Sequence, residues 1–356
     1  MELRILFAVD KSRKIYISYF TKALEKKGII CKIIDDLDIY DKSVSNQKIL
    51  RWMKKPKKIE KIFSEFKPDL IFTERVSHLS SLSLKFKIPL VIFLRGDYWN
   101  EVVESKKDLN KALNKKIELW TKEKIAEKCF KESALILPIC KYLEKIVQNR
   151  YPDKYVDVLY QGIDDSEWFH QEGRKLEHPC IGMVQDANIW KKTKELTILP
   201  KILEKFPNVH FYWAGDGPFR DKVLEKLKKF ENFHWLGRLE YPNKVREFLS
   251  EIDVYALFSG SDMSPHTILE AGLMKKPILA TDVGGISESL EDNMGFLIKE
   301  NAVNEWIEKI SFLINDEEKI LEMGKNGYKN TKKKFNWEKI ADDFLEIIAK
   351  SNIIKQ

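Results

Sequence analysis

The chain has 356 residues, of which 44% are hydrophobic and 33% are charged, a composition typical of folded globular proteins rather than disordered ones. That length exceeds what a single hydrophobic core usually supports, so two domains are expected. No apolar run reaches the roughly 18 residues that cross a bilayer, and the first residues lead directly into a strand-like segment. Neither a membrane span nor a signal peptide is therefore predicted.

The formal net charge of +7 is unevenly distributed. Residues 1–170 hold 34 Lys and Arg against 25 Asp and Glu, a net +9, whereas residues 171–356 hold 28 against 30, a net −2. The excess is densest in RWMKKPKKIEK, residues 51–61. A solvated helix face explains such a run, and a face for an anionic membrane surface or a phosphate-bearing acceptor is the functional alternative. A nucleic-acid partner is not predicted, because no recognition module is found.

The cysteines are scattered, without a CxxC pair and without a histidine at the spacing expected of metal ligands; they are Cys31, Cys129, Cys140 and Cys180. This pattern predicts buried free thiols in a reducing cytoplasm, with neither a disulfide nor a bound metal.

Strand-like and helix-like segments alternate through the first half. Apolar runs predict strands at residues 4–10, 31–35, 67–74, 88–97, 134–140 and 156–164. After the first run, YISYFTKALEKKG has the spacing of an amphipathic helix that ends at Gly28. Continuous apolar strands are typical of a parallel sheet buried on both faces, and helices between them form βαβ units.

The same alternation restarts in the second half, where strands are predicted at residues 179–186, 209–218, 233–239, 254–260, 277–285 and 295–300. Three helical stretches finish the chain. We therefore predict an α/β protein with two Rossmann-like doubly wound domains that face a cleft. The predicted domains are residues 1–170 and 171–356, joined by the polar segment 164–179, with C-terminal helices that can cross back to the first domain.

Ligands of open α/β sheets bind beyond the carboxyl ends of strands, so the strand-to-helix turns of the second half are candidate sites. Gly215 and Gly217, in AGDGP, either permit a close ligand contact or serve a simple tight turn. Lys191 and Lys192 precede a predicted helix, where they are either a diphosphate clamp or solvated cations.

The segment SDMSPHTILEAGL, residues 261–273, is the third and richest of these turns. Ser264 is predicted as an N-cap with Pro265 at the first helical position, which puts His266 in the first turn. The free backbone N–H groups of such a helix start, together with the helix dipole, favour an anionic ligand.

Two acidic residues flank this helix start. Asp262 lies in the preceding loop and Glu270 lies on the helix, so both can face one ligand. A structural role is the usual one for a single histidine, and the position of His266 beside a predicted anion site makes a functional role the alternative.

In combination, these segments resemble the nucleotide-sugar-binding half of the GT-B glycosyltransferases, specifically family GT4, the glycosyl transferases group 1. The similar blocks occur in family order, which is more specific than any single block. They are ALILPICKYLEKIV, VLYQGIDDSEWF, FYWAGDGPFRDKV, FHWLGRL, IDVYALFS and DMSPHTILEAGLMKKPILATDVGGISE.

The resemblance assigns roles to the donor-side residues. It implies that Glu270 accepts hydrogen bonds from the ribose hydroxyls and that Asp262 takes the place of the family's first glutamate, near the donor sugar. Lys191 or Lys192 would neutralise the leaving diphosphate. The backbone amides around the helix start would hold the sugar and diphosphate, those of Met263, Ser264 and Thr267 among them.

The chain also departs from the family pattern. Asp262 is one methylene shorter than the usual glutamate, and Met183 stands where the family has an arginine, a loss of charge that His266 could offset. The first half lacks the Gly-Gly loop after its first strand, and Arg95 stands where the family commonly has a histidine. Arg95 and Asp97 are predicted on the acceptor side, with a structural ion pair as the alternative.

The resemblance implies transfer of a sugar, with retention of anomeric configuration, from a UDP- or GDP-sugar to a hydroxyl of a glycan or lipid-linked acceptor. The leaving phosphate would act as the base, and neither a metal nor another cofactor is implied. The alternatives are a GT-B-fold epimerase or phosphorylase and a non-catalytic nucleotide-sugar-binding subunit. A cytoplasmic location is expected, with peripheral membrane association through the basic first domain as the alternative.

Overall fold

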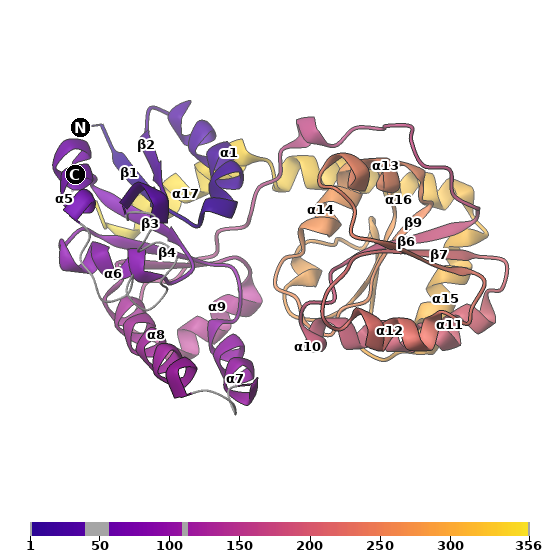
Figure 1. Cartoon of the computed structure of the whole chain (residues 1–356). Coiled ribbons are helices and arrows are strands. Elements are labelled where there is room, and N and C mark those ends of the chain that lie inside the picture. Colours follow the sequence, from indigo (N-terminus) through magenta and orange to yellow (C-terminus); the bar gives the residue numbers. More distant parts are fainter. Residues whose placement is uncertain (1, 40–56, 109–112, 355–356) are drawn as a thin grey trace. The chain divides into compact units, whose positions relative to one another are not determined.

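A computed structural model of the chain describes residues 2–39, 57–108 and 113–354. The chain divides into two compact units, one formed by Met1–Gly162 with Trp337–Gln356 and the other by Ile163–Asn336. Figure 1 shows the helices and strands of each unit, coloured along the sequence. The first part of the basic run, residues 51–56, lies outside the described residues.

The described strands of the first unit form a five-stranded parallel sheet in the order β2-β1-β3-β4-β5. These strands are β1 (Arg4–Ala8), β2 (Ile30–Ile34), β3 (Leu70–Glu74), β4 (Leu90–Leu94) and β5 (Leu135–Pro138). Every residue of β4, LVIFL, is buried, as expected for a strand that helices cover on both faces.

The helices of the first unit include one from the far end of the chain. They are η1 (Lys11–Arg13), α1 (Lys14–Glu25), α2 (Asp36–Ile39), α5 (Lys57–Phe66), α6 (His78–Lys85), α7 (Tyr98–Asp108), α8 (Leu113–Glu132), α9 (Lys141–Arg150) and α17 (Trp337–Ser351). Figure 1 shows α17, in yellow, among the indigo and purple elements of this unit. The ring centroids of Phe20 on α1 and Phe344 on α17 are 5.4 Å apart, so aromatic packing attaches the last helix to this unit.

The described strands of the second unit form a six-stranded parallel sheet in the order β11-β10-β9-β6-β7-β8. They are β6 (Cys180–Val184), β7 (His210–Ala214), β8 (Phe233–Gly237), β9 (Val254–Leu257), β10 (Ile278–Thr281) and β11 (Gly295–Ile298). On one face of this sheet, Phe258 stacks on Trp306 with ring centroids 3.8 Å apart, and both side chains are fully buried.

The helices of this unit cover both faces of its sheet. They are η2 (Asp165–Glu167), α10 (Trp190–Thr193), η3 (Lys194–Ile198), α11 (Leu199–Lys205), α12 (Arg220–Leu227), α13 (Asn243–Glu251), α14 (His266–Leu273), η4 (Ile286–Glu288), α15 (Val303–Ile314) and α16 (Glu317–Lys334). The two parallel sheets with their helices confirm the predicted α/β fold class.

One predicted strand, at residues 156–164, is wrong. The structure has only isolated bridges there, between Ile136 and Val156 and between Ile163 and Asn336. The segment begins to pair with β5, because the Ile136 N–H donates to the Tyr155 carbonyl. Pro138 follows in β5 and has no N–H to donate, so a regular ladder cannot continue past it.

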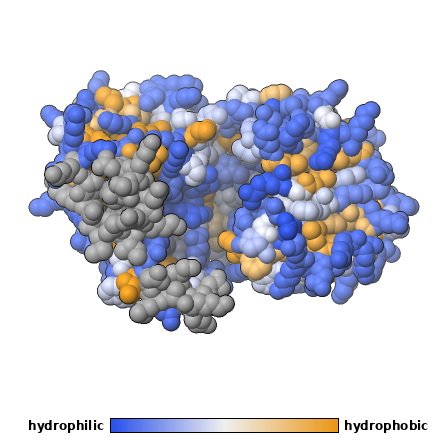
Figure 2. Space-filling view, in the orientation of Figure 1, coloured by the Kyte–Doolittle hydropathy of each residue, from blue (hydrophilic) through white to orange (hydrophobic). Residues whose placement is uncertain are grey.

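No described helix is both long enough and apolar enough to cross a bilayer. Figure 2 shows a largely hydrophilic face on each unit, with apolar side chains in small separate patches.

Helices α14 and α16 cross at a pair of glycines. A Cβ atom on Gly272 of α14 would lie 2.4 Å from the Thr331 hydroxyl oxygen of α16, whereas one on Gly327 of α16 would have no neighbour closer than 3.5 Å. A methyl group on Gly272 would therefore have to displace the Thr331 hydroxyl, whereas one on Gly327 would displace no atom. This contact sets how closely α14 approaches the rest of the unit.

We expect Gly272→Ala to lower the free energy of unfolding by about 1–3 kcal/mol, because the added methyl overpacks a buried contact. Gly327→Ala is the matched control, and it should leave stability unchanged or raise it by up to about 1 kcal/mol through helix propensity. Urea unfolding followed by circular dichroism measures both. Equal effects of the two substitutions would contradict this description of the helix crossing.

Candidate functional site

The richest polar cluster of the second unit lies in the loops that follow the carboxyl ends of β6, β7, β9 and β10. Gln185, directly after β6, joins two of these loops. Its Nε2 donates to the Phe258 carbonyl at 2.8 Å, and its Oε1 accepts from the Phe258 N–H at 3.1 Å. Sequence reasoning missed this residue, because a glutamine after a strand gives no signal until its partner is known.

Asp262 and Lys192 lie together in this cluster. Lys192 Nζ is 2.9 Å from Asp262 Oδ2, and the other carboxylate oxygen of Asp262 accepts from the Met263 N–H at 2.8 Å. The Lys192 side chain is 40% exposed and that of Asp262 is 17% exposed, so a ligand can reach the pair. The Lys191 side chain is also exposed, and its backbone carbonyl packs against Gly260.

The glycine pair after β10 fits tightly on the Asp262 loop. Gly284 has a φ of +61°, and a Cβ atom there would lie 1.9 Å from the Asp262 carbonyl oxygen. The Gly285 N–H donates to that same carbonyl at 3.0 Å. The backbone that carries Asp262 is therefore fixed by a contact that only glycine permits.

Gly215 and Gly217 make a similar contact between the loops after β7 and β6. A Cβ atom on Gly215 would lie 1.9 Å from the Gln185 carbonyl oxygen. One on Gly217, whose φ is +143°, would lie 2.6 Å from the Ala187 carbonyl oxygen. Close loop packing is thus sufficient to explain both glycines, and a ligand contact remains a prediction.

Helix α14 begins one residue later than predicted. Pro265 is the N-cap, with φ −70° and ψ 122°, and His266 is the first helical residue. The prediction that Ser264 is the N-cap is wrong, because the extended ψ of Pro265 keeps that residue outside the helix. His266 is half-buried at the helix start, and the Thr267 hydroxyl oxygen lies 2.6 Å from that of Tyr255, which is fully buried on β9.

Glu270 is the buried acid of the cluster. It is only 2% exposed, and the Tyr241 hydroxyl donates to its Oε1 at 3.1 Å. Burial raises the pKa of the Glu270 carboxyl to about 7, an effect that the Tyr241 hydrogen bond opposes. Tyr241 was missed by sequence reasoning, because it follows β8 and lies 29 residues from its partner.

Met183 does not lie at the surface of this cluster. It is fully buried within β6 and packs in the hydrophobic core of the unit. The Met183 side chain therefore does not occupy a position at the loops where a charged side chain would have contributed. A different arginine reaches the loop after β6. Arg238, directly after β8, forms an ion pair with Asp186 of that loop, with Nη2 and Oδ2 3.2 Å apart.

In the first unit, Arg95 is part of an ion-pair cluster. Its Nη1 is 2.6 Å from Glu74 Oε1, and its Nη2 donates to Gln161 Oε1 at 2.9 Å. Arg13 Nε also pairs with Glu74, at 3.1 Å. Burial raises the pKa of the Glu74 carboxyl, and the Arg13 charge opposes this shift. These partners come from distant parts of the first unit's sequence, and sequence reasoning did not find them.

Asp97 is not a partner of Arg95 in this cluster. Its Oδ1 accepts from the Asn100 N–H at 3.0 Å, which stabilises the start of α7. The structure therefore separates the two acceptor-side candidates into an ion-pair cluster and a helix start.

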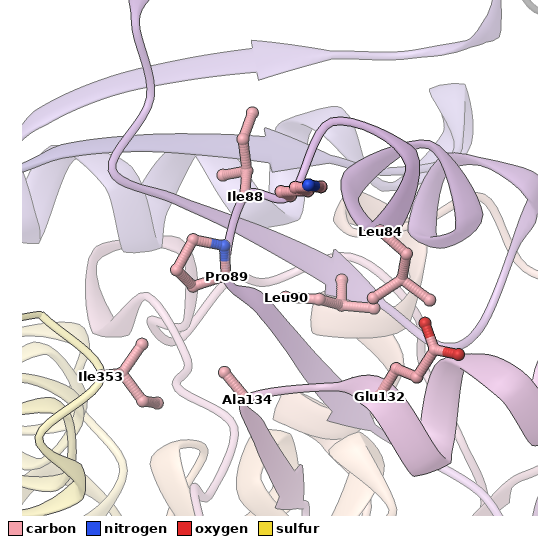
Figure 3. A pocket seen from close by; sticks show the side chains of 8 residues that line it. Leu84, Ile88, Pro89, Leu90, Glu132, Ala134 and Ile353 are labelled. Atoms are coloured by element: carbon pink, nitrogen blue, oxygen red, sulfur yellow. The ribbon is translucent and has the colours of Figure 1, made fainter.

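A cavity of about 300 Å³ lies beside the first sheet at the amino ends of β4 and β5, the ends opposite to those where ligands of such sheets bind. Figure 3 shows mainly aliphatic side chains around it; the lining residues are Leu84, Lys87, Ile88, Pro89, Leu90, Glu132, Ala134 and Ile353. Because ligands of open α/β sheets bind at the carboxyl ends, we do not place the functional site there.

Residues 164–330 match the family model described as glycosyl transferases group 1. An uncharacterized glycosyltransferase of Methanocaldococcus jannaschii is 28% identical over 207 residues, which are 57% of this chain and 56% of that protein. A trehalose synthase of Thermococcus litoralis is 29% identical over 184 residues, 48% of this chain and 44% of that protein. The chain thus spans about half the length of these relatives.

Solved structures are similar over almost the whole chain. A sucrose-phosphate synthase from Thermosynechococcus elongatus has a TM-score of 0.72 at 13% identity, covering 98% of this chain and 99% of its own. Anabaena HepE in complex with UDP-glucose has a TM-score of 0.67 at 16% identity, covering 98% and 100%. At these identities the structures show the GT-B fold alone, and the family match covers residues 164–330.

The raised pKa of Glu270 predicts a pH-dependent cost of burying its charge. Between about pH 4.5 and pH 7 the unfolded chain has lost this proton while the folded chain still holds it, so the folded state becomes less stable relative to the unfolded state as pH rises. In the ligand-free protein, this effect lowers the free energy of unfolding by up to about 3 kcal/mol across that pH range, and we expect Glu270→Gln to abolish this decrease. Urea unfolding at several pH values measures it, with exposed Glu225→Gln as the control. Parallel pH profiles for wild type and Glu270→Gln would refute the assignment.

Proposed function

We propose that this protein is a retaining glycosyltransferase that moves a sugar from a nucleotide-diphosphate donor to an acceptor hydroxyl. The observation that carries the proposal is the buried Glu270 carboxylate on α14, the helix that directly follows the loop holding Asp262 of the accessible Lys192–Asp262 pair. The group 1 family match over residues 164–330 includes all three residues.

Glu270 is proposed to bind the ribose of the donor. A buried carboxylate has more acceptor capacity than the single Tyr241 hydroxyl uses, and two ribose hydroxyls can supply the missing donors. Because such hydrogen bonds favour the ionised carboxylate, donor binding would lower the raised pKa of Glu270. Ribose binding therefore stabilises a charge that the ligand-free protein holds at a cost.

Lys192 is proposed to bind the diphosphate, together with Lys191 and backbone N–H groups at the start of α14, those of Met263, Ser264 and Thr267 among them. Lys192 already pairs with Asp262, and a diphosphate carries enough negative charge to compete for the ammonium group. Asp262, once released in part, can accept a hydrogen bond from a donor-sugar hydroxyl. Gly215 and Gly217 would border this site, and His266 would face the sugar phosphate.

In the transfer step, the bond between the anomeric carbon and the diphosphate oxygen breaks, and a bond from that carbon to the acceptor oxygen forms. The acceptor hydroxyl proton passes to the departing phosphate oxygen on the same face of the sugar, which gives retention. Negative charge grows on the leaving diphosphate, so Lys192 and the helix start stabilise the transition state more than the ground state. We propose that these groups supply the required positive charge without a metal or another cofactor at the donor site.

The acceptor is proposed to bind the first unit, with Arg95 and Asp97 on its side of the reaction. Arg13 and Arg95 share the single carboxylate of Glu74, so this cluster carries an excess positive charge when Glu74 is ionised. A glycan or a lipid-linked acceptor that bears an anionic group would complement it. A cytoplasmic location, with attachment of the basic first domain to an anionic membrane surface, is part of the same proposal, and no nucleic-acid partner is proposed.

A nucleotide titration tests the donor site. HepE was solved with UDP-glucose, so UDP and UDP-glucose are the first ligands to test, followed by GDP and GDP-sugars. We expect Glu270→Gln to weaken binding by about 10–100-fold, because hydrogen bonds to a charged group contribute about 1.5–3 kcal/mol. Isothermal titration calorimetry measures the affinity, and Glu225→Gln should bind as wild type does. Unchanged affinity in Glu270→Gln would refute ribose binding at this residue.

A kinetic comparison tests the role of Lys192. We expect Lys192→Met to lower kcat by about 10²–10³-fold while nucleotide affinity falls much less, because the lysine acts mainly on charge that develops in the transition state. Release of nucleoside diphosphate in the presence of an acceptor measures kcat, and Lys222→Met, on α12, is the control.

The product also discriminates between the alternatives. An α-linked product from an α-linked donor, identified by NMR, supports retention, whereas an inverted product refutes it. Donor binding without transfer to any glycan or lipid acceptor would favour a non-catalytic subunit. Turnover of the nucleotide-sugar without an acceptor would favour an epimerase.

A further inference from the structure

A second polar cluster lies at the amino ends of β6 and β9, the ends of these strands opposite to those that carry the proposed donor site. It consists of His178, Cys180 and Asp253, whose nitrogen, sulfur and oxygen ligand atoms all lie within 4.8 Å of one another. Cys180 is the first residue of β6, and Asp253 directly precedes β9, the neighbouring strand. The donor site of the proposed function uses the carboxyl ends of the same strands, so the two clusters are separate.

The geometry of this cluster suits a tetrahedral metal ion. His178 Nδ1 is 2.9 Å from Asp253 Oδ2 and 3.7 Å from Cys180 Sγ. Ligand atoms held about 2.0–2.3 Å from a tetrahedral zinc ion are about 3.3–3.6 Å apart, so both of these His178 distances lie within about half an ångström of that range. An imidazole, a thiolate and a carboxylate are the donor types that zinc takes in proteins.

Glu251 supplies an independent observation that points to a metal. Its Oε1 lies 3.3 Å from His178 Nε2, the ring nitrogen that faces away from Asp253. A carboxylate that holds one ring nitrogen of a histidine while the other binds a metal is the usual outer-shell arrangement of histidine ligands. Glu251 thus fixes the ring so that Nδ1 is directed at Cys180 and Asp253.

The charges around this cluster also balance with a divalent ion. A Cys180 thiolate and the Asp253 carboxylate together offset the two positive charges of the ion. Glu251 and the mostly buried Lys276, whose Nζ donates to the Ser250 carbonyl at 2.8 Å, then offset each other. The His178 side chain is 42% exposed, which gives an ion access from solvent.

We propose that His178, Cys180 and Asp253 form a zinc site, with a water molecule as the fourth ligand. Binding replaces the thiol proton of Cys180, which passes to solvent, by a bond from sulfur to the metal. The ion joins the segment before β6 to the segment before β9 and so stabilises the amino edge of this sheet. The His-x-Cys spacing and an aspartate 73 residues away form no common zinc motif, and the expectation from sequence was that no metal is bound.

Cobalt titration of the chelator-stripped full chain tests the proposal, because Co²⁺ bound by a thiolate gives a sulfur-to-metal absorption that carboxylate or histidine sites lack. We expect this absorption in wild type, its displacement by Zn²⁺, and a higher thermal unfolding temperature with Zn²⁺. Cys180→Ala should abolish the absorption, whereas Cys31→Ala should retain it. Glu251→Gln should weaken binding by about 10–100-fold without removing it.

Wild-type protein that shows no sulfur-to-cobalt absorption, or an absorption that persists in Cys180→Ala, would overturn the proposal. If Cys180→Ala does not fold, His178→Gln and Asp253→Asn take its place, since Asn can still accept the Cys180 N–H that Asp253 accepts at 2.7 Å. Unchanged cobalt affinity in both of these variants would equally overturn it. The result is independent of nucleotide binding, so failure here leaves the proposed transferase function intact.

Discussion

The burial of one carboxylate, Glu270, is the constraint on which the proposed donor site depends. A carboxyl group with 2% exposure and one protein hydrogen bond from Tyr241 is costly to ionise, which is why its pKa rises to about 7. The fold maintains this arrangement because α14 is held against α16 at Gly272, where a side chain would not fit. A ligand that supplies hydroxyl donors would offset the cost, so the same feature that strains the ligand-free protein favours ribose binding.

The loops around Glu270 are held by an uncharged side-chain amide and by close backbone contacts rather than by side-chain charge. Gln185 connects the loops after β6 and β9, and Gly284 lets the loop after β10 approach the Asp262 carbonyl. Such contacts leave the polar side chains of Lys192 and Asp262 accessible while their backbone stays fixed. Rigid placement of this kind is what electrostatic stabilisation of a leaving group requires, because the charges need not reorganise during the reaction.

Most strands and the fold class could be predicted from the sequence, because buried parallel strands are short continuous apolar runs. The run at residues 156–164 is the instructive failure, since its pairing is limited by Pro138, a residue of the neighbouring strand. The start of α14 differed by one residue, because proline suits both the cap and the first helical position. Tyr241, Gln185 and Glu74 could not be predicted, because their roles depend on partners that only the folded chain brings close.

The central claim, that Glu270 binds the ribose as a carboxylate, is tested most directly by counting protons during donor binding. UDP-glucose has no group that titrates near pH 7, so calorimetric titration in two buffers of different ionisation enthalpy reports the protein's own protons. With a pKa of about 7 in the free protein, Glu270 should release about half a proton at pH 7, and Glu270→Gln should release correspondingly less. Binding of UDP-glucose with equal proton release in both proteins would contradict the account.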